Sequence, residues 1–245
     1  MKKILLAFLA GTITLSACQK DVLTLTKSTS LCQQTAVVFD YFNGHKKVHS
    51  QTDFTYNNEH KLTRSGSDYS FEWSAKQMVM WSFTDSAVQY QSTYLLDDFG
   101  RAVCQTTTDS AGVYDHNETF EYDTAGYLIK VIRSGNAASV KTKEWIHGNM
   151  VKEVTTSQSG EVRTITYSYD PNLVYPDSYI RVPIMGKHHK NLFVKSEAID
   201  SSGTSSTIYQ FELDSHGNVV KQIEKWVKPE KSIIFTLRYT YEMSK

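Results

Sequence analysis

Proline, glycine and net charge are all scarce in this sequence. Its 245 residues include 4 prolines and 12 glycines, which excludes a low-complexity linker. The 26 basic and 26 acidic residues cancel, and no basic patch stands out along the chain, so we expect no nucleic-acid partner. Hydrophobic residues make up 40% of the chain and aromatic residues 12%, which is typical of a folded protein. The length suits one large all-β domain or two small ones.

Motifs of known chemistry are also missing. The sequence has no G-x-S-x-G, no H-E-x-x-H and no glycine-rich phosphate loop. Its three cysteines show no C-x-x-C or Cys/His ligand spacing. We interpret the eight scattered histidines as solvated loop or turn residues, with His60, His116, His147 and His216 in turns. We therefore expect no catalytic residues, no metal site, no cofactor and no enzymatic activity.

The N-terminus carries the most specific motif. Residues 1–3 are a short basic segment and residues 4–15 an apolar one, too short to span the ~30 Å hydrocarbon core of a membrane as a helix. Residues 15–18, Leu-Ser-Ala-Cys, match the bacterial lipobox, in which a cysteine thiol accepts a diacylglyceryl group. The match predicts that residues 1–17 are a signal peptide, removed to leave Cys18 as a lipidated N-terminus.

The residues after Cys18 predict where the protein is held. Two or three acyl chains on Cys18, palmitate among them, would anchor it stably to a membrane. Gln19 in place of Asp resembles lipoproteins sent to the outer membrane, and Gln-Lys-Asp at 19–21 resembles the export signal of some surface-displayed lipoproteins. Surface exposure and a periplasm-facing position both stay open. Residues 18–35 are expected to form a flexible tether spanning about 20–25 Å.

Lipidation of Cys18 leaves Cys32 and Cys104. Export permits a disulfide, but nothing in the sequence places these two residues within the ~7 Å between Cα atoms that a bridge needs. Two unpaired, partly buried thiols are the simpler interpretation, and the pairing stays open.

A degenerate repeat fills the rest of the chain. Its clearest copy is residues 120–132, F-E-Y-D-T-A-G-Y-L-I-K-V-I, with aromatic residues at the first and third positions, Asp at the fourth and Gly at the seventh. Nearly complete copies begin at Phe54, Tyr94 and Phe211, and partial copies at Phe71, Glu144 and Tyr167. A period of this size indicates a repetitive architecture.

Each position of the repeat has a mechanical reason. The first and third side chains share one face of a strand, the Asp bonds the turn backbone, and the Gly supplies a positive φ. Asp97 of the Asp97-Asp98 pair fills the same turn position, so we interpret it as structural. No segment has a sustained helical period. Residues 36–245 are thus predicted to be a single all-β domain, an antiparallel β-meander of repeated hairpins forming one strongly curved sheet or an open or closed barrel.

Two resemblances follow from these residues. Tyr122-Asp123 with Gly126, and its copies, resemble the tyrosine-aspartate repeats of Rhs-type shells. The lipobox, the repeats and residues 186–192, G-K-H-H-K-N-L, together are similar to uncharacterised bacterial lipoproteins described as having a porin-like fold. That resemblance implies a β-meander curled towards a barrel and brings no activity or site residues. We favour a soluble curved sheet or barrel over an inserted barrel because the strands are often polar at alternate positions.

The repeat is interrupted at residues 171–192, which hold three of the four prolines and form the longest irregular connection. Long connections of this kind tend to be functional or disordered. We take this segment as the candidate ligand loop, with the candidate residues Tyr175, Tyr179, His188, His189 and Asn191.

Three hypotheses of function remain. The first is a non-catalytic binding or scaffold lipoprotein of the outer membrane, with a glycan, a peptide or a partner protein as its ligand. The second is a carrier that holds a small apolar ligand inside the curled sheet, which requires an interior cavity lined by Tyr, Phe and Met. The third, an enzyme with an unrecognised site, is the least favoured. The tryptophans could form a carbohydrate-stacking platform, but core packing is favoured because burying one large apolar side chain stabilises by ~1.5–3 kcal/mol; they are Trp73, Trp81, Trp145 and Trp226.

Overall fold

The computed structural model describes residues 32–42, 47–59, 61–135, 137–176, 183–228 and 231–243. In these residues the chain forms sixteen β-strands and one short 3-10 helix, η1 (Pro183–Met185). The strands are β1 (Cys32–Phe42), β2 (Lys47–Tyr56), β3 (Leu62–Ser65), β4 (Tyr69–Trp73), β5 (Gln77–Thr84), β6 (Ala87–Leu96), β7 (Ala102–Asp109), β8 (Tyr114–Tyr122), β9 (Leu128–Gly135), β10 (Ser139–Ile146), β11 (Asn149–Ser157), β12 (Val162–Val174), β13 (Asn191–Asp200), β14 (Gly203–Leu213), β15 (Val219–Lys228) and β16 (Lys231–Met243).

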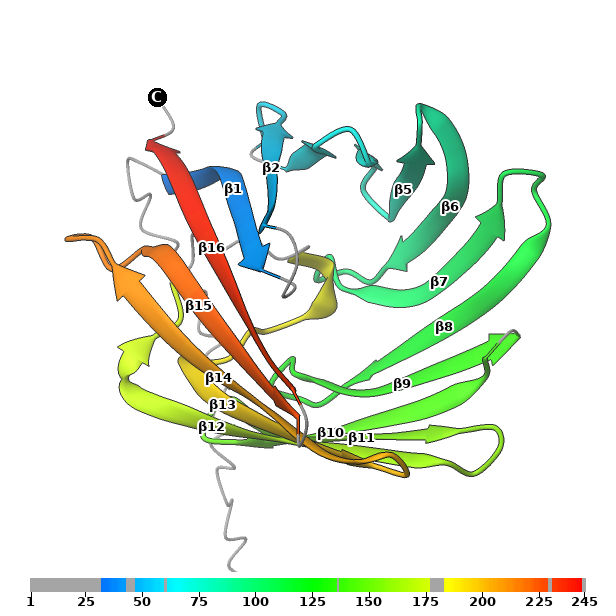
Figure 1. Ribbon diagram of the computed structural model, residues 1–245. Coiled ribbons are helices and arrows are strands. Elements are labelled where there is room, and N and C mark those ends of the chain that lie inside the picture. The colour runs from blue at the N-terminus through cyan, green and yellow to red at the C-terminus, as the bar shows by residue number, and fades with distance from the viewer. Residues whose placement is uncertain are drawn as a thin grey trace, which may run out of the picture.

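The strands form one closed barrel. Each strand pairs antiparallel with the next along the chain, and β1 pairs with β16 to complete the ring (Figure 1). The predicted all-β meander of hairpins is confirmed, and of the forms left open the closed barrel is the one adopted. β1 begins at Cys32, before residue 36, where the domain was expected to start. Cys18 and the predicted signal peptide lie outside the described residues.

The predicted turn chemistry is present in the hairpins. Asp97 Oδ1 accepts hydrogen bonds from the backbone N–H groups of Phe99 (2.9 Å) and Arg101 (2.8 Å), which confirms the structural interpretation of Asp97. Asp214 makes the equivalent pair of bonds in the β14–β15 turn. Gly126, at the seventh position of the clearest repeat, has φ +91° and allows the chain to reverse there.

Aromatic residues in six even-numbered strands, four of them at the third repeat position, tie neighbouring strands together. The Tyr122 hydroxyl donates to the Ala102 carbonyl (2.8 Å), and Trp145 Nε1–H donates to the Leu128 carbonyl (2.8 Å). Equivalent bonds run from Tyr56 to Gln34, Trp73 to Leu62, Tyr169 to Met150 and Tyr241 to Val219. Each joins the end of an even-numbered strand to the start of the preceding strand. We call this set of bonds the girdle. Each bond satisfies the polar atom of an aromatic side chain whose ring packs against the barrel.

The girdle marks the end of the barrel at which the β8–β9 and β10–β11 turns lie, which we call the plugged end. The main apolar cluster also gathers at this end, with Phe71 and Met78 beside the β4–β5 turn, Phe120 and Leu128 beside the β8–β9 turn, and Ile184 from outside the ladder. Ile184 is part of the β12–β13 connection, so the repeat and its interruption share one core.

Two further findings concern the membrane and the cysteines. No helix among the described residues is long and apolar enough to cross a membrane. Cys104 is a free cysteine of intermediate exposure. The side chain of Cys32 is not among those described.

Candidate functional site

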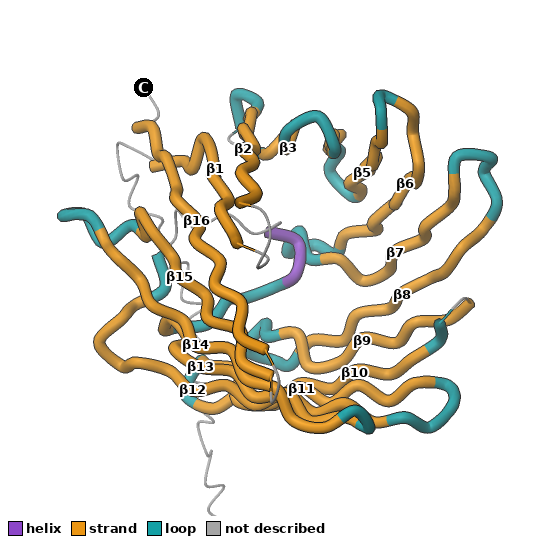
Figure 2. Tube along the Cα trace, viewed as in Figure 1, coloured by secondary structure: helices purple, strands orange, loops and turns teal. Residues whose placement is uncertain are grey.

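The interrupted repeat crosses the plugged end of the barrel. We call residues 183–190, which include η1, the plug; Figure 2 shows η1 lying inside the ring of strands. Backbone hydrogen bonds fix the plug to two turns, from Lys187 N–H to the Gly126 carbonyl (3.0 Å) and from Lys190 N–H to the Gly148 carbonyl (2.9 Å). The plug is thus docked on the barrel by its own main chain.

Two plug residues are inserted deeply. Ile184 is 1% exposed and packs in the main apolar cluster. The Tyr122 hydroxyl, which bonds to Ala102, also lies 3.2 Å from the Ile184 carbonyl oxygen, which accepts a hydrogen bond from it. Gly186 has φ +76°, and a Cβ there would lie 2.6 Å from the Gly126 carbonyl oxygen. Only glycine combines this backbone conformation with so close an approach.

The irregular connection is shorter than predicted. β12 continues to Val174, so Pro171 lies within a strand and the connection runs over residues 175–190. The ladder tolerates Pro171 because the register of β12 against β13 shifts between Tyr169 and Val174.

A cavity of about 630 Å³ lies between the plug and the barrel wall. Its apolar lining contains tyrosine, phenylalanine and methionine, as the carrier hypothesis requires. These lining residues are Met78, Met80, Tyr94, Phe120, Leu128, Val131, Trp145, Met150, Ile184 and Met185. The volume falls within the range of about 300–1,000 Å³ that is usual for small-molecule sites.

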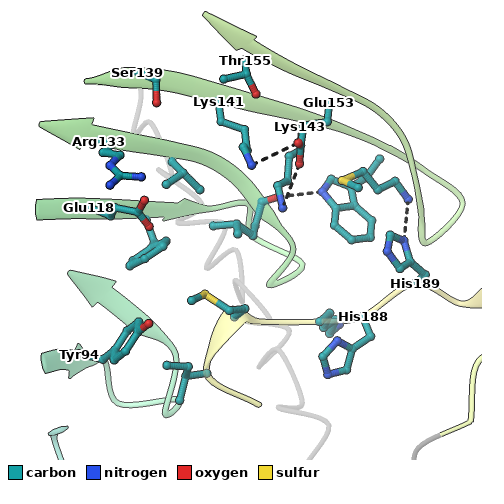
Figure 3. A pocket seen from close by; sticks show the side chains of 18 of the residues that line it. Tyr94, Glu118, Arg133, Ser139, Lys141, Lys143, Glu153, Thr155, His188 and His189 are labelled. Atoms are coloured by element: carbon teal, nitrogen blue, oxygen red, sulfur yellow. Dashed lines mark hydrogen bonds and ion pairs between the residues drawn. The ribbon is translucent and has the colours of Figure 1, made fainter. Parts of the chain in front are cut away.

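The rest of the lining is polar and carries an excess of positive charge. Figure 3 shows the charged side chains on the strands, across the cavity from His188 and His189 of the plug. The polar lining residues are Glu118, Arg133, Ser139, Lys141, Lys143, Glu153, Thr155, Arg163 and Lys187. Five of them are basic and two acidic, a formal excess of three positive charges.

One acidic side chain organises two of the lysines. The Glu153 carboxylate, on β11, lies 3.2 Å from Lys141 Nζ and 3.6 Å from Lys143 Nζ, both on β10. The Glu153 side chain is 12% exposed, which strengthens these contacts relative to surface pairs. A single carboxylate therefore faces two ammonium groups.

Polarity changes along the barrel axis. On β10 the inward positions run Ser139, Lys141, Lys143 and then Trp145, and Trp145 is next to the plugged end. On β8 Glu118 precedes Phe120 in the same direction. On the barrel wall, the apolar lining thus lies next to the plug and the charged lining lies further along the barrel, while the plug itself contributes one basic residue, Lys187.

The predicted site histidines both line the cavity. His189 is 7% exposed and stacks on Trp145 (centroids 5.2 Å apart), so its interpretation as a solvated histidine is wrong. The Met150 N–H donates to His189 Nδ1 (3.4 Å), which places the ring proton of the neutral form on Nε2. His188 stacks on Tyr175 (5.8 Å).

Three predicted site residues lie elsewhere. Tyr175 is buried behind the plug against Leu192 and Val219. The Asn191 amide donates to the Pro171 carbonyl (3.0 Å) and accepts from the Asn149 amide (3.0 Å), so it holds the connection in place. Tyr179 lies outside the described residues.

Burial changes the acidity of two tyrosines near the cavity. Burial, and then the charge of Glu118, raises the pKa of Tyr94 to about 12. Burial also raises the pKa of Tyr122 to about 12, against the opposing charge of Arg101. Both hydroxyls are therefore neutral at physiological pH.

Sequence reasoning missed the basic lining. Arg133, Lys141, Lys143 and Arg163 are separated along the chain and form no run of charge. A signal was present, because Lys141 and Lys143 alternate in step with Trp145 and so share its face of the strand. His116 was also misplaced, since it lies within β8 and is 9% exposed.

No group of three or more His, Cys, Asp or Glu residues could hold a metal ion within the ranges that the structure describes.

Comparison with known proteins places the fold. The sequence matches no described protein family and no curated protein sequence. A porin-like protein from Bacteroides uniformis matches in structure with a TM-score of 0.66 and 19% identity, over 85% of this chain and 98% of that one. The chain has a porin-like β-barrel fold. A porin-like protein from Bacteroides vulgatus matches with a TM-score of 0.59 and 12% identity, over 84% and 97% of the two chains.

The expected resemblance to porin-like proteins is confirmed for the fold. The predicted lipid anchor and the similarity to tyrosine-aspartate repeats stay predictions.

Proposed function

We propose that this protein is a non-catalytic, lipid-anchored binding protein that holds a small, largely apolar molecule inside its plugged barrel. The observation that carries the proposal is the interior cavity of about 630 Å³, lined by methionine, phenylalanine and tyrosine against the plug. Water in such a lining gains few hydrogen bonds, so an apolar ligand that displaces it binds favourably.

The outer face of the barrel favours an anchor over insertion. Outward positions on β8–β11 include Glu121, Lys130, Glu144 and Lys152, and Lys130 Nζ lies 3.0 Å from Glu121 Oε1. Each Arg or Lys side chain on a lipid-facing surface costs about 2–4 kcal/mol near the bilayer midplane, and each Asp or Glu costs less. Attachment through acyl chains on Cys18 avoids this cost.

The proposed location is the outer membrane, in keeping with Gln19 and with the porin-like neighbours. Protease treatment of intact cells tests the orientation, because only a surface-exposed barrel is cleaved. A Cys18→Ala variant should leave the membrane fraction, and its retention there would contradict the anchor.

Ligand binding is tested with a neutral naphthylamine probe, whose fluorescence rises in an apolar site. Wild-type protein should bind it with saturation. Val131→Trp fills the cavity from β9 and should abolish binding, whereas Val140→Trp, on an outward position of β10, should not. Absence of saturable binding by the wild type, or equal binding by the Val131→Trp variant, would refute the proposed function.

A further inference from the structure

We infer that the ligand is a single-chain amphiphile with an anionic head group, bound with its apolar chain against the plug and its head among the basic residues of the wall. This inference rests on the proposed function and adds the chemical class of the ligand and its orientation. Carboxylate, sulfate and phosphate head groups share the chemistry that these basic residues recognise.

The first argument is the sign of the charge. Four basic side chains of the wall, Arg133, Lys141, Lys143 and Arg163, line the cavity against two carboxylates, Glu118 and Glu153, and the two lysines share Glu153. Bringing these cations together in a partly enclosed space costs free energy through mutual repulsion. A bound anion relieves that repulsion, whereas a bound cation adds to it.

The second argument is an incomplete hydrogen-bond inventory at Arg133. Its terminal Nη2 contacts His116 Nδ1 (3.0 Å), but its buried Nε–H has no acceptor among the described residues. A buried donor without an acceptor costs about the desolvation of the group, so such donors are rare unless a ligand or water completes them. An anionic oxygen is the acceptor that a guanidinium binds best.

The third argument is the separation of the two kinds of lining. Along β10, Lys141 and Lys143 lie further from the plug than Trp145, and on β9 Arg133 lies further than Leu128. A ligand of one polarity would leave half of this lining unmatched. An amphiphile matches both halves at once and in only one orientation.

The head group is tested first on wild-type protein. Calorimetric titrations compare dodecanoate, its methyl ester, dodecanol and dodecylamine, all below their micellar concentrations. We expect dodecanoate to bind at least tenfold more tightly than the neutral compounds, and dodecylamine to bind most weakly. Dodecyl sulfate and dodecyl phosphate then rank the anionic heads.

Variants locate the head. Lys141→Gln combined with Lys143→Gln should reduce dodecanoate affinity at least tenfold and change methyl ester affinity little. Lys143→Gln combined with Glu153→Gln removes one charge of each sign, so dodecanoate binding should persist. The matched control is Lys130→Gln combined with Lys152→Gln, which removes two positive charges from the outer face and should change neither affinity.

The outcomes separate this inference from the proposed function. Equal affinity for dodecanoate and its methyl ester, or a preference for the amine, overturns the anionic class while leaving an apolar carrier intact. Absence of binding by every compound refutes the proposed function as well. Since the head-group comparison uses wild-type protein, it decides the question even if a lysine variant fails to fold.

Discussion

Replacing Gly186 with alanine should release the plug from the barrel. The new Cβ would lie 2.6 Å from the Gly126 carbonyl oxygen and 2.7 Å from Tyr122 Cε1. That oxygen accepts the Lys187 N–H, and the hydroxyl of that ring donates to the Ile184 carbonyl. The added methyl group therefore pushes on two attachments of the plug, while the bond from Lys190 to Gly148 is not contacted.

Two free-energy costs act on the docked plug in Gly186→Ala. An L-residue in the left-handed region costs roughly 1–2 kcal/mol, and Gly186 has φ +76°. Overpacking against a fixed neighbour adds about 1–3 kcal/mol. Gly112, in the β7–β8 turn, has φ +75°, but a Cβ there meets nothing within 4 Å among the described atoms. The Gly112→Ala variant thus carries the backbone strain without the clash.

The strain of Gly112→Ala lies in the β7–β8 turn and not in the plug, so the two variants differ in plug opening by both costs, about 2–5 kcal/mol together. Since 1.4 kcal/mol corresponds to a tenfold change in an equilibrium, we expect the plug to open roughly 30- to 4,000-fold more often in Gly186→Ala than in Gly112→Ala. Trypsin reports this opening, because Lys187 and Lys190 lie in the plug and cleavage tracks the population of the open form when closing is fast. Hydrogen exchange at the Lys187 amide should rise in parallel.

The prediction is open to a clear refutation. Equal cleavage rates in Gly186→Ala and Gly112→Ala would show that the contact with Gly126 does not hold the plug. Urea unfolding serves as a control for the barrel itself. In Gly186→Ala, the free energy of global unfolding should fall less than the free energy of plug opening measured by hydrogen exchange at the Lys187 amide. Collapse of the whole barrel in Gly186→Ala would mean that plug and barrel unfold as one unit.

Two pH dependences also follow from the structure. Burial and the charge of Glu118 raise the pKa of Tyr94 to about 12, so the stability that its neutral form provides is present below pH ~10 and is lost as the pH rises from there to about 12. Tyr94→Phe should flatten this alkaline decline in denaturant titrations, and an unchanged decline would contradict the assignment. For Asp97, burial alone would raise the pKa, but the hydrogen bonds from Arg101 and Phe99 and the Arg101 charge outweigh it and lower the pKa. The stability that its charged form provides is therefore present above pH ~3.9 and is lost as the pH falls below that value. Asp97→Asn should lose less stability than the wild type in denaturant titrations between pH ~5 and ~2. An equal loss of stability in the variant and the wild type would contradict this role of Asp97.

The hairpins were predictable because their determinants are local. Period-two alternation places Phe120 and Tyr122 on one face, and Asp123 with Gly126 fixes the turn within a few residues. The repeat therefore predicts a meander before any pairing is known. The girdle gives the third-position aromatic a reason beyond burial, since its polar atom must reach a carbonyl on the adjacent strand.

Closure of the barrel and the composition of the cavity were not predictable in the same way. Pairing of β1 with β16 depends on the accumulated curvature of every hairpin between them. His189 was misjudged for a related reason, because its neighbours Trp145 and Tyr169 come from other strands. Strand alternation does place Lys141 on the face of Trp145, but which face points inward emerges only when the ring closes.

The interruption of the repeat helps to fill a barrel that is too wide to be closed by the side chains of its own strands. Barrels of about eight strands fill their interior with their own side chains, whereas barrels of about sixteen leave a channel. This barrel has sixteen strands, and a further short turn between β12 and β13 would leave its plugged end without Ile184. Docking residues 183–190 across that end converts the channel into a cavity closed on one side, with an apolar base and a cationic wall. The departure from the repeat thus gives this porin-like fold the one-sided cavity in which we place the proposed ligand.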